Sequence, residues 1–350
     1  MDENDEVFVH HPKAREARRV IVHAIASAPP GTTAILLSGG LDTSIIAEAV
    51  GGRQFVDAIT VSCGDDVGNP KHDLSYAQHI ARRAKLNHHV VSIPDTLSIM
   101  DPSPSGALHL AVQTLQTFDP MELRGGVAVA RALLHAQSLG ITSIVTGDGA
   151  DEMFAGYSFV TTLAEDKLNA WRERAAKHMQ FCATKLGQAL GISVYQPFVQ
   201  PDVVAFALSC TKADLVATHD GAIHGKFVLR AAFPEAFSRW RDKVPLETGA
   251  GTTPLGTLFD HHTPTDEFDQ ERQDILAQDG IAVRSAEHLH YYRVFRTTFH
   301  RPNGADWTTR VRRHDSDPCV QCGFQLERPD QYFCKTCGAW PARTSLPPTS

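Results

Sequence analysis

The chain has 350 residues, of which 42% are hydrophobic and 21% are charged, and its formal net charge is -7. This length and apolar content allow one large domain with a sizeable core or two smaller domains, and the lack of a basic excess argues against nucleic acid as the default partner. The acidic start Met1–Glu6 lacks the charge pattern of a secretory signal, and no apolar run is long enough to span a bilayer, so we expect a soluble, cytoplasmic protein.

The first half of the chain alternates short apolar runs with segments of helical spacing. A helix is expected to begin near Pro12, within an N-terminal extension of residues 1–30. The expected strands are Thr33–Leu37, Phe55–Ser62, His89–Ile93 and Ile141–Thr146, and the expected helices between them are Thr43–Val50, Asp73–Leu86 and Leu123–Leu139. This alternation predicts an α/β fold with a doubly wound parallel sheet, which binds ligands outside the carboxyl ends of its strands.

After Tyr157 the pattern changes, and no further strand is evident. Helical segments are expected at Leu163–Leu190, Pro201–Leu208, Phe227–Phe237 and Ala286–Phe299. The stretch Pro245–Asp266 is rich in Gly, Thr and Pro and is predicted to be a loop. Residues 344–350 are predicted to form a disordered tail.

The segment Ser38–Ser44, of sequence SGGLDTS, follows the first expected strand and precedes a helix. Glycines let a backbone approach a phosphate closely, and N–H groups and hydroxyls at a helix start can donate to it. Asp42 can hold a magnesium ion that bridges phosphates. A simple Gly-Gly turn is the alternative, but it does not account for the placement of the Ser, Asp and Thr residues. The segment is therefore predicted to bind phosphate, and without GxxxxGK[ST] it is not a Walker-type loop.

A second motif, Thr146–Tyr157, follows the fourth expected strand. Three of its side chains, Asp148, Asp151 and Glu152, are carboxylates placed among glycines, a combination that suits a hard cation. An acidic turn with helix-capping residues is the alternative interpretation. The metal-binding interpretation is favoured because both motifs follow parallel strands and would face one crevice.

Together the two motifs resemble those of β-lactam synthetase and of the synthetase domain of asparagine synthetase. These proteins belong to the PP-loop ATP pyrophosphatases, which have a HUP-like fold. The family pattern SGxGxDExFxGY is closely followed by the second motif. Further segments that resemble the family are Phe118–Arg124, Gln196–Phe198, Lys226–Arg230, Lys243 with Gly249–Gly251, and Tyr291–Phe295. The resemblance covers roughly Thr33 to Phe299, and it implies a synthetase domain at residues 31–300 with a helical C-terminal half.

The resemblance implies an ATP-dependent ligase that adenylates a carboxylate, releases pyrophosphate, and lets ammonia or an amine displace AMP. The residues implied to hold pyrophosphate are Ser38, Gly39, Gly40, Thr43 and Ser44. Asp42 and Asp151 would bind magnesium, and Val61 and Gly147 would lie against adenosine. Lys243 would stabilise charge on the phosphates or the acyl-adenylate, with a solvated surface lysine as the alternative.

Two features of the resemblance leave the second substrate open. Asp148 stands where the family usually has Glu, a residue linked to handling the incoming amine, so the nucleophile is uncertain. Because the Ser38 loop lies close to Met1, we expect no glutaminase domain before it. We therefore expect the nitrogen to come from free ammonia, a partner's ammonia or a substrate amine. Arg124 could meet a substrate carboxylate or form a structural ion pair.

Four of the seven cysteines form two CxxC pairs, Cys319/Cys322 and Cys334/Cys337, separated by eleven residues. This spacing predicts a structural tetrahedral zinc site in a ribbon at residues 301–343. A redox dithiol or an iron–sulfur site is the alternative. The ribbon could dock a carrier or partner protein, recognise RNA, or only staple the C-terminus. The other cysteines, Cys63, Cys182 and Cys210, are interpreted as buried small hydrophobes.

A zinc ribbon also fits a second hypothesis, a PP-loop sulfur transferase acting on tRNA or a carrier. The Gly147–Tyr157 motif, the acidic charge and the lack of a catalytic cysteine pair near the loop weigh against it. Cys63 is the one candidate nucleophile for such a reaction. A non-catalytic binding protein is a third hypothesis, and the intact Ser38–Ser44 loop with Asp42 and Asp151 argues against it.

Overall fold

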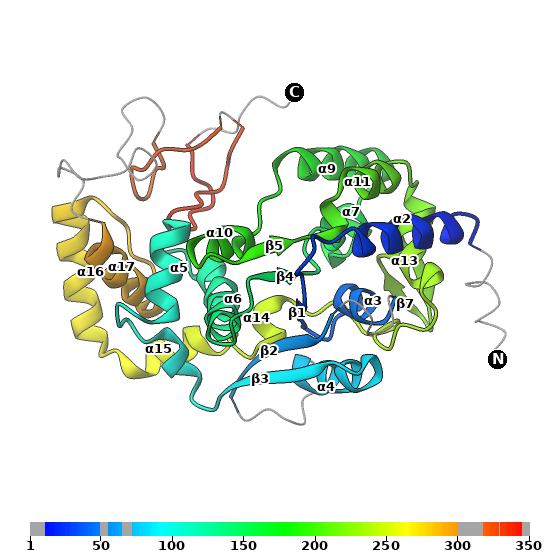
Figure 1. Cartoon of the computed structure of the whole chain (residues 1–350). Coiled ribbons are helices and arrows are strands. Elements are labelled where there is room, and N and C mark those ends of the chain that lie inside the picture. Colours follow the sequence, from blue (N-terminus) through cyan, green and yellow to red (C-terminus); the bar gives the residue numbers. More distant parts are fainter. Residues whose placement is uncertain (1–10, 50–54, 65–71, 300–317, 329, 345–350) are drawn as a thin grey trace. The chain divides into compact units, whose positions relative to one another are not determined.

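The computed structural model describes residues 11–49, 55–64, 72–299, 318–328 and 330–344 (Figure 1). These residues group into two compact units, which we describe separately. The first unit comprises the described residues within 11–62, 72–92 and 132–250, and the second comprises those within 63–64, 93–131 and 251–344. The predicted domain boundaries at residues 30, 300 and 343 remain predictions. Residues 301–317 of the expected ribbon and 345–350 of the expected tail lie outside the described residues.

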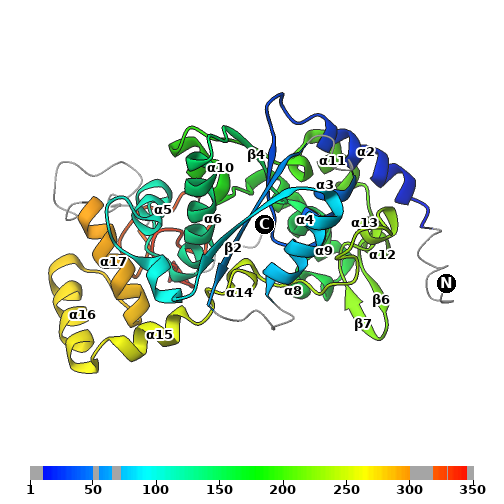
Figure 2. The same ribbon diagram turned by 60° about the horizontal axis from the view of Figure 1, so that its bottom comes forward.

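A five-stranded parallel sheet forms the centre of the first unit, with the strand order β3-β2-β1-β4-β5. The strands are β1 Ala34–Leu36, β2 Asp57–Cys63, β3 Asn87–Ile93, β4 Ser143–Val145 and β5 Ser193–Tyr195. The long strands β2 and β3 lie side by side (Figure 2). The predicted doubly wound α/β fold is confirmed.

The strand order places a switch point between β1 and β4. From β1 the chain moves outward through β2 to β3, and it then returns to β4 on the other side of β1. In sheets of this kind, ligands bind outside the carboxyl ends of the strands at the switch point. Both sequence motifs begin at these ends.

Helices surround the sheet of the first unit. Their bounds are α2 Ala14–Ala26, α3 Leu41–Ala49, α4 Asp73–Ala84, α7 Ala150–Met153, α8 Ser158–Thr161, α9 Glu165–His178, α10 Cys182–Ala189, α11 Pro201–Leu208, α12 Lys212–Leu215, α13 Phe227–Ala232 and α14 Leu246–Gly249, with a 3-10 turn at Pro197–Val199. Helix α3 packs on α4, and α2 packs on both α11 and α13. On α4, Ala77, Ile80, Ala81 and Ala84 are buried, as their helical spacing predicts.

The second unit is mainly helical. Its elements are the 3-10 turn Thr96–Met100, α5 Ala107–Leu115, the first part of α6 Pro120–Ser138, α15 Leu255–His262, α16 Thr265–Asp279 and α17 Ala286–Thr298. Helix α17 packs on α5 and α15. Its aromatic side chains Tyr292 and Phe295 are buried, and both rings contact Phe118. Among the described residues, no helix combines the length and apolar character needed to cross a bilayer.

Several expectations about the second half of the chain are wrong. Strand β5 was not expected, nor was the antiparallel hairpin β6 Ala217–His219 with β7 Ala222–His224. Each of these strands has three residues, too few to show a period of two. The expected helix Leu163–Leu190 is two helices, α9 and α10, separated at residues 179–181.

The stretch Pro245–Asp266 is helical rather than a loop. Pro245, Pro254 and Pro264 directly precede α14, α15 and α16. Proline is tolerated at a helix start because the first N–H groups of a helix have no partner within it. The composition that suggested a loop therefore marks three helix starts.

Candidate active site and cysteine cluster

The loop after β1 is folded around its own hydroxyl groups. Ser38 Oγ lies 3.3 Å from Thr43 Oγ1, and the N–H of Gly40 donates to Ser38 Oγ at 3.3 Å. Ser44 instead donates its hydroxyl to Glu48 at 2.5 Å and its N–H to the Gly40 carbonyl. Ser38 and Thr43 are thus placed at the loop as predicted, whereas the Ser44 hydroxyl is engaged within α3.

A segment of the same unit, residues 238–243, braces this loop. Ser238 Oγ donates to the Gly39 carbonyl at 2.6 Å. Arg241 donates from Nη1 to the Ser38 carbonyl at 3.4 Å and from Nη2 to Asp73 Oδ1 at 2.9 Å. Its guanidinium also lies over the Tyr76 ring, 4.1 Å from the centroid. The backbone shape of the loop therefore depends on Ser238 and Arg241, neither of which was singled out from the sequence.

The two motifs meet at Gly147, two residues after the end of β4. A Cβ atom on Gly147 would lie 3.0 Å from Asp42 Cβ and 3.2 Å from Thr43 Cγ2. Contacts this short are tighter than most side chains tolerate, so a glycine allows the loop after β1 to approach the end of β4. The switch point between β1 and β4 is therefore the place where the two motifs come together.

Two lysines join the predicted magnesium ligands. Lys226 Nζ lies 2.8 Å and 2.6 Å from the two carboxylate oxygens of Asp42, and 2.7 Å from Asp151 Oδ1. Lys243 Nζ lies 2.8 Å from Asp151 Oδ2. Two positive and two negative side chains thus form one cluster, which we call the charged cluster: Asp42, Asp151, Lys226 and Lys243. In it, Lys243 pairs with Asp151, and its side chain is one third exposed.

Lys226 is the member of the charged cluster that sequence reasoning missed. It was noted only as part of a segment resembling the family, without a role. Its side chain is 5% exposed, and its backbone adopts the left-handed conformation with φ 58° immediately before α13. Its N–H donates to the Phe154 carbonyl at 2.9 Å, which ties it to the second motif.

Gly156 makes the packing of Lys226 and Asp151 possible. A Cβ atom there would lie 1.8 Å from Asp151 Oδ1 and 2.5 Å from Lys226 Cε. Asp151 Oδ1 is buried and, apart from its ion pair with Lys226, accepts no well-aligned hydrogen bond from any residue that the structure describes. This oxygen has unused acceptor capacity, which is the property expected of a ligand for a hard cation.

The lysines determine the ionisation of Asp151, whereas at Asp42 burial outweighs Lys226 and raises the pKa of that carboxyl. Burial opposes ionisation of Asp151, but the ammonium groups of Lys226 and Lys243 outweigh it and lower the pKa of Asp151 to about 2. Burial likewise favours a neutral Lys243, but Asp151 outweighs it and raises the pKa of Lys243. Both groups are therefore charged at neutral pH, as binding of a metal and a polyphosphate would require.

Asp148 lies beside the charged cluster but outside its ion pairs. Its Oδ2 accepts hydrogen bonds from Thr146 Oγ1 at 2.7 Å and from Gln196 Nε2 at 2.8 Å. Burial raises the pKa of Asp148, although these two hydrogen bonds act in the opposite direction. A carboxyl group with a raised pKa is better suited to accept a proton than an ordinary aspartate is.

Val61 and Arg124 are two further residues for which the sequence predicts a possible ligand contact. Val61 is nearly buried in β2, and its contact with adenosine remains a prediction. In the second unit, Arg124 forms a bidentate ion pair with Glu287, at 2.8 Å from Nε and 2.5 Å from Nη2. Glu287 also accepts a hydrogen bond from Tyr291 at 2.8 Å. This arrangement favours the structural ion pair over a substrate contact for Arg124.

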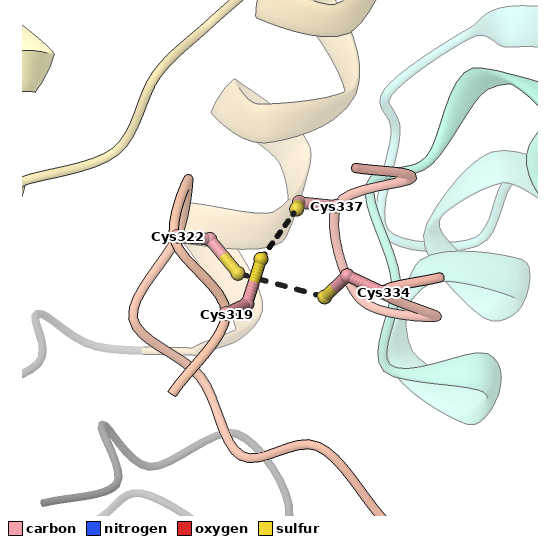
Figure 3. Close-up of side chains that lie close together, drawn as sticks. All are labelled: Cys319, Cys322, Cys334 and Cys337. Carbon is pink, nitrogen blue, oxygen red and sulfur yellow. Dashed lines mark hydrogen bonds between the residues drawn. The ribbon is translucent and has the colours of Figure 1, made fainter. Parts of the chain in front are cut away.

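The four paired cysteines come together in the second unit and point toward one another (Figure 3). All four are buried, and their sulfur atoms lie within 4.8 Å of one another. The Sγ atoms of Cys319 and Cys337 are 3.7 Å apart, as are those of Cys322 and Cys334. Sulfur atoms around a tetrahedral zinc, with bonds of about 2.3 Å, lie about 3.8 Å apart. The four cysteines, which we call the cysteine cluster, could therefore hold a zinc ion.

Comparisons with known proteins agree with both motifs. The family model described as asparagine synthase matches residues 20–187. The chain is 25% identical over 299 residues to asparagine synthetase [glutamine-hydrolyzing] 1 of Arabidopsis thaliana, covering 78% of this chain and 49% of that protein. It is 24% identical over 327 residues to asparagine synthetase [glutamine-hydrolyzing] 1 of Lotus japonicus, covering 87% and 53%. The chain spans about half the length of the curated relatives it matches.

Proposed function

Residues 20–187 of this chain belong to the asparagine synthase family, and on that premise we propose that the chain is an ATP-dependent ligase that forms an amide bond. The observation that carries the proposal is the charged cluster, in which Asp42 of the first motif and Asp151 of the second share Lys226. Such a cluster at the carboxyl ends of β1 and β4 suits a metal-bound polyphosphate. ATP is proposed as one substrate and a carboxylate as the other.

We assign the parts of ATP to the residues that the sequence predicts. Backbone N–H groups and hydroxyls of Ser38, Gly39, Gly40 and Thr43 would donate to the pyrophosphate portion. Ser44 would contribute only if its hydroxyl left Glu48. Adenosine would lie against Val61 and Gly147.

Asp42 and Asp151 would hold a magnesium ion, and the unused acceptor capacity of Asp151 Oδ1 supports this assignment. A magnesium ion supplies charge neutralisation and orientation of phosphate oxygens when bound. Lys226 now links both carboxylates, so its ammonium would move aside or bind a phosphate oxygen together with them.

The first chemical step is adenylation. An oxygen of the substrate carboxylate attacks the α-phosphorus of ATP, and the bond from that phosphorus to the bridging oxygen breaks. Pyrophosphate leaves with the electron pair. Lys226 and Lys243 would compensate the negative charge that develops on the phosphate oxygens, since both ammonium groups already lie at this site.

The second step forms the amide. The nitrogen lone pair of ammonia or an amine attacks the acyl carbon, and the bond to the AMP oxygen breaks. The attacking nitrogen must lose a proton, and Asp148, whose pKa is raised by burial, is proposed to accept it.

The proposal is tested by ATP–pyrophosphate exchange with a panel of carboxylic acids that includes aspartate. We expect exchange that depends on one acid and is lost in Asp42→Asn, whereas Asp202→Asn, which changes an exposed aspartate of α11, should leave it intact. Exchange that survives in Asp42→Asn would contradict the assigned site. Ammonium should then support amide formation, while turnover with glutamine alone would contradict the expectation of an external nitrogen source.

The sulfur transferase hypothesis is disfavoured by the environment of its candidate nucleophile. Burial raises the pKa of the Cys63 thiol to about 12, so very little of it would be thiolate at neutral pH. The relatives described above are asparagine synthetases, and their names do not indicate sulfur transfer. Replacement of Cys63 by Ser should leave pyrophosphate exchange unchanged.

A further inference from the structure

The cysteine cluster is built from two turns of the same geometry. In each turn the N–H of the glycine after the second cysteine donates to the carbonyl of the first cysteine at 2.8 Å: Gly323 to Cys319, and Gly338 to Cys334. Both glycines have positive φ, 69° and 73°. Such turns present two sulfur atoms each in the same direction. Two of them facing one another make a closed tetrahedral site with no position left for a substrate.

Backbone hydrogen bonds tie these turns to the helical part of the second unit. The carbonyl of Thr336, between Cys334 and Cys337, accepts hydrogen bonds from the N–H of Phe118 at 2.8 Å and from Thr117 Oγ1 at 3.1 Å. The carbonyl of Gln321, in the other turn, accepts from the N–H of Ala282 at 3.0 Å. These bonds connect both turns to backbone that directly precedes α6 and α17.

One arginine contacts both turns. Arg284 donates from Nη2 to the Cys337 carbonyl at 2.5 Å and from Nη1 to the Gly338 carbonyl at 2.9 Å. The same Nη1 lies 3.3 Å from Oε1 of Gln321 in the first turn. A zinc ion with four thiolates carries two net negative charges, and a guanidinium bound to the ligand backbone compensates part of that charge.

Apolar packing joins the cysteine cluster to the core of the second unit. Phe324, two residues after Cys322, is fully buried, and its ring centroid lies 6.0 Å from that of Phe295 on α17. Phe295 in turn contacts Phe118. The side chains around the cluster are therefore part of the same aromatic core that holds α17.

We propose that the cysteine cluster is a structural zinc site that fastens residues 318–344 to α17 and to residues 117–118, with Arg284 as a positioning residue that holds both turns. The zinc ion is then required for the packing of the second unit, because free energy of metal binding becomes free energy of folding where the site does not exist in the unfolded chain. Of the three roles that the sequence allowed for the ribbon, this proposal is the purely structural one, in which the ribbon fastens the C-terminal residues. It does not depend on the proposed ligase activity.

The metal itself is tested by elemental analysis of the purified full chain. We expect a single zinc ion per chain, lost in Cys319→Ser and kept in Cys182→Ser, which changes a cysteine outside the cluster. Replacement of zinc by cobalt should give the absorption bands of tetrahedral thiolate coordination. A chain that retains no zinc after expression with added zinc, and shows no such bands with cobalt, would overturn the proposal.

The coupling to the fold is tested by hydrogen exchange of the wild-type chain before and after removal of zinc with a chelator. Exchange should accelerate at least about tenfold in α17 and α5, while β1 and β4 keep their protection. Unchanged protection of α17 without zinc would show that the cysteine cluster is an independent module and would refute the staple.

The role of Arg284 is tested by the affinity for zinc, measured by competition with a chelating dye. Arg284→Ala should lose zinc about 10-fold more readily, as expected when a residue that orients metal ligands is removed. Arg272→Ala, which changes an exposed arginine of α16 that contacts Asp269 and the Phe268 ring in its own helix, serves as the matched control. Equal zinc affinity in the two variants would show that Arg284 does not position the zinc ligands.

Discussion

The charged cluster of the first unit and the cysteine cluster of the second reach charge balance by different means. In the first, the chain itself supplies two lysines for the two carboxylates of Asp42 and Asp151. In the second, the chain gathers four thiols, and the balancing cation has to come from solution. A cluster with its own counter-charges can form before a ligand arrives, whereas thiolates need their metal in order to stay together. The first site is therefore suited to exchange its ligands, and the second is suited to hold one metal ion permanently.

The largest effect is expected from Lys226→Met, which breaks the charge balance of the first unit. Removing one partner of a buried ion pair costs about 3–5 kcal/mol of stability, and pyrophosphate exchange should fall at least ~100-fold. Because Asp42 would then take up a proton in the folded state while Asp151 keeps Lys243, the variant should lose less stability at pH 5 than at pH 7.5. Urea unfolding at both values measures this, with Lys177→Met, an exposed lysine of α9, as control. A stability equal to that of wild type would show that Lys226 does not balance the cluster.

A large effect on activity with little effect on folding is expected from Lys243→Met. Its side chain is one third exposed, and Asp151 keeps Lys226 as a partner in the variant. Pyrophosphate exchange should fall about 100- to 1,000-fold, as when one group that stabilises transition-state charge is removed. Thermal unfolding monitored beside the exchange assay separates the two effects. A large drop in melting temperature with pyrophosphate exchange preserved would show that Lys243 has a structural role instead.

A moderate effect is expected from Arg241→Lys, which tests whether the brace behind the phosphate loop matters. Lysine cannot reach the Ser38 carbonyl and Asp73 in the paired geometry of a guanidinium. The KM for ATP should rise about 10-fold while kcat changes less, since the loop loses its position but keeps its donors. The conservative change Arg18→Lys, at an exposed ion pair with Glu235, should leave both constants unchanged. A fall in kcat with an unchanged KM would argue for a different role.

A further effect is expected from pH, through His288 in the second unit. Burial, with a contribution from Arg284, lowers the pKa of His288 to about 3, and its Nε2 has no hydrogen-bond partner among the described residues. The folded state therefore excludes a proton that the unfolded chain binds below its pKa of 6.5. Stability from this group is complete above pH 6.5 and is lost as the pH falls toward 3, by up to about 1.4 kcal/mol per pH unit.

The pH dependence due to His288 must be separated from that of the cysteine cluster, because its thiolates also become protonated at low pH. Unfolding of zinc-loaded wild type and of His288→Gln should be followed between pH 7.5 and pH 5. The variant should be less stable at pH 7.5 but show a weaker dependence on pH. Identical pH profiles would assign the whole dependence of the second unit to its cysteines.

Local sequence determined the parts that depend on neighbours in the chain. The buried spacing of α4, the succession of strands β1 to β4 along the chain, the two motifs and the two cysteine turns follow from periodicity and from glycines at fixed places. The cysteine spacing was informative because each pair forms one turn on its own. Strand β5 and the helices after Pro245 were missed because three-residue strands and proline-led helices have ambiguous local patterns.

Only the tertiary structure decided which side chains face one another over long distances in the sequence. Nothing local connects Lys226 with Asp42, 184 residues away, or Arg241 with Ser38, 203 residues away. The sequence identified both carboxylates because each lies in a contiguous motif, but it did not identify the lysine that pairs with both. Such pairs form where separate elements pack, so their energy depends on burial and on distances that no local pattern encodes.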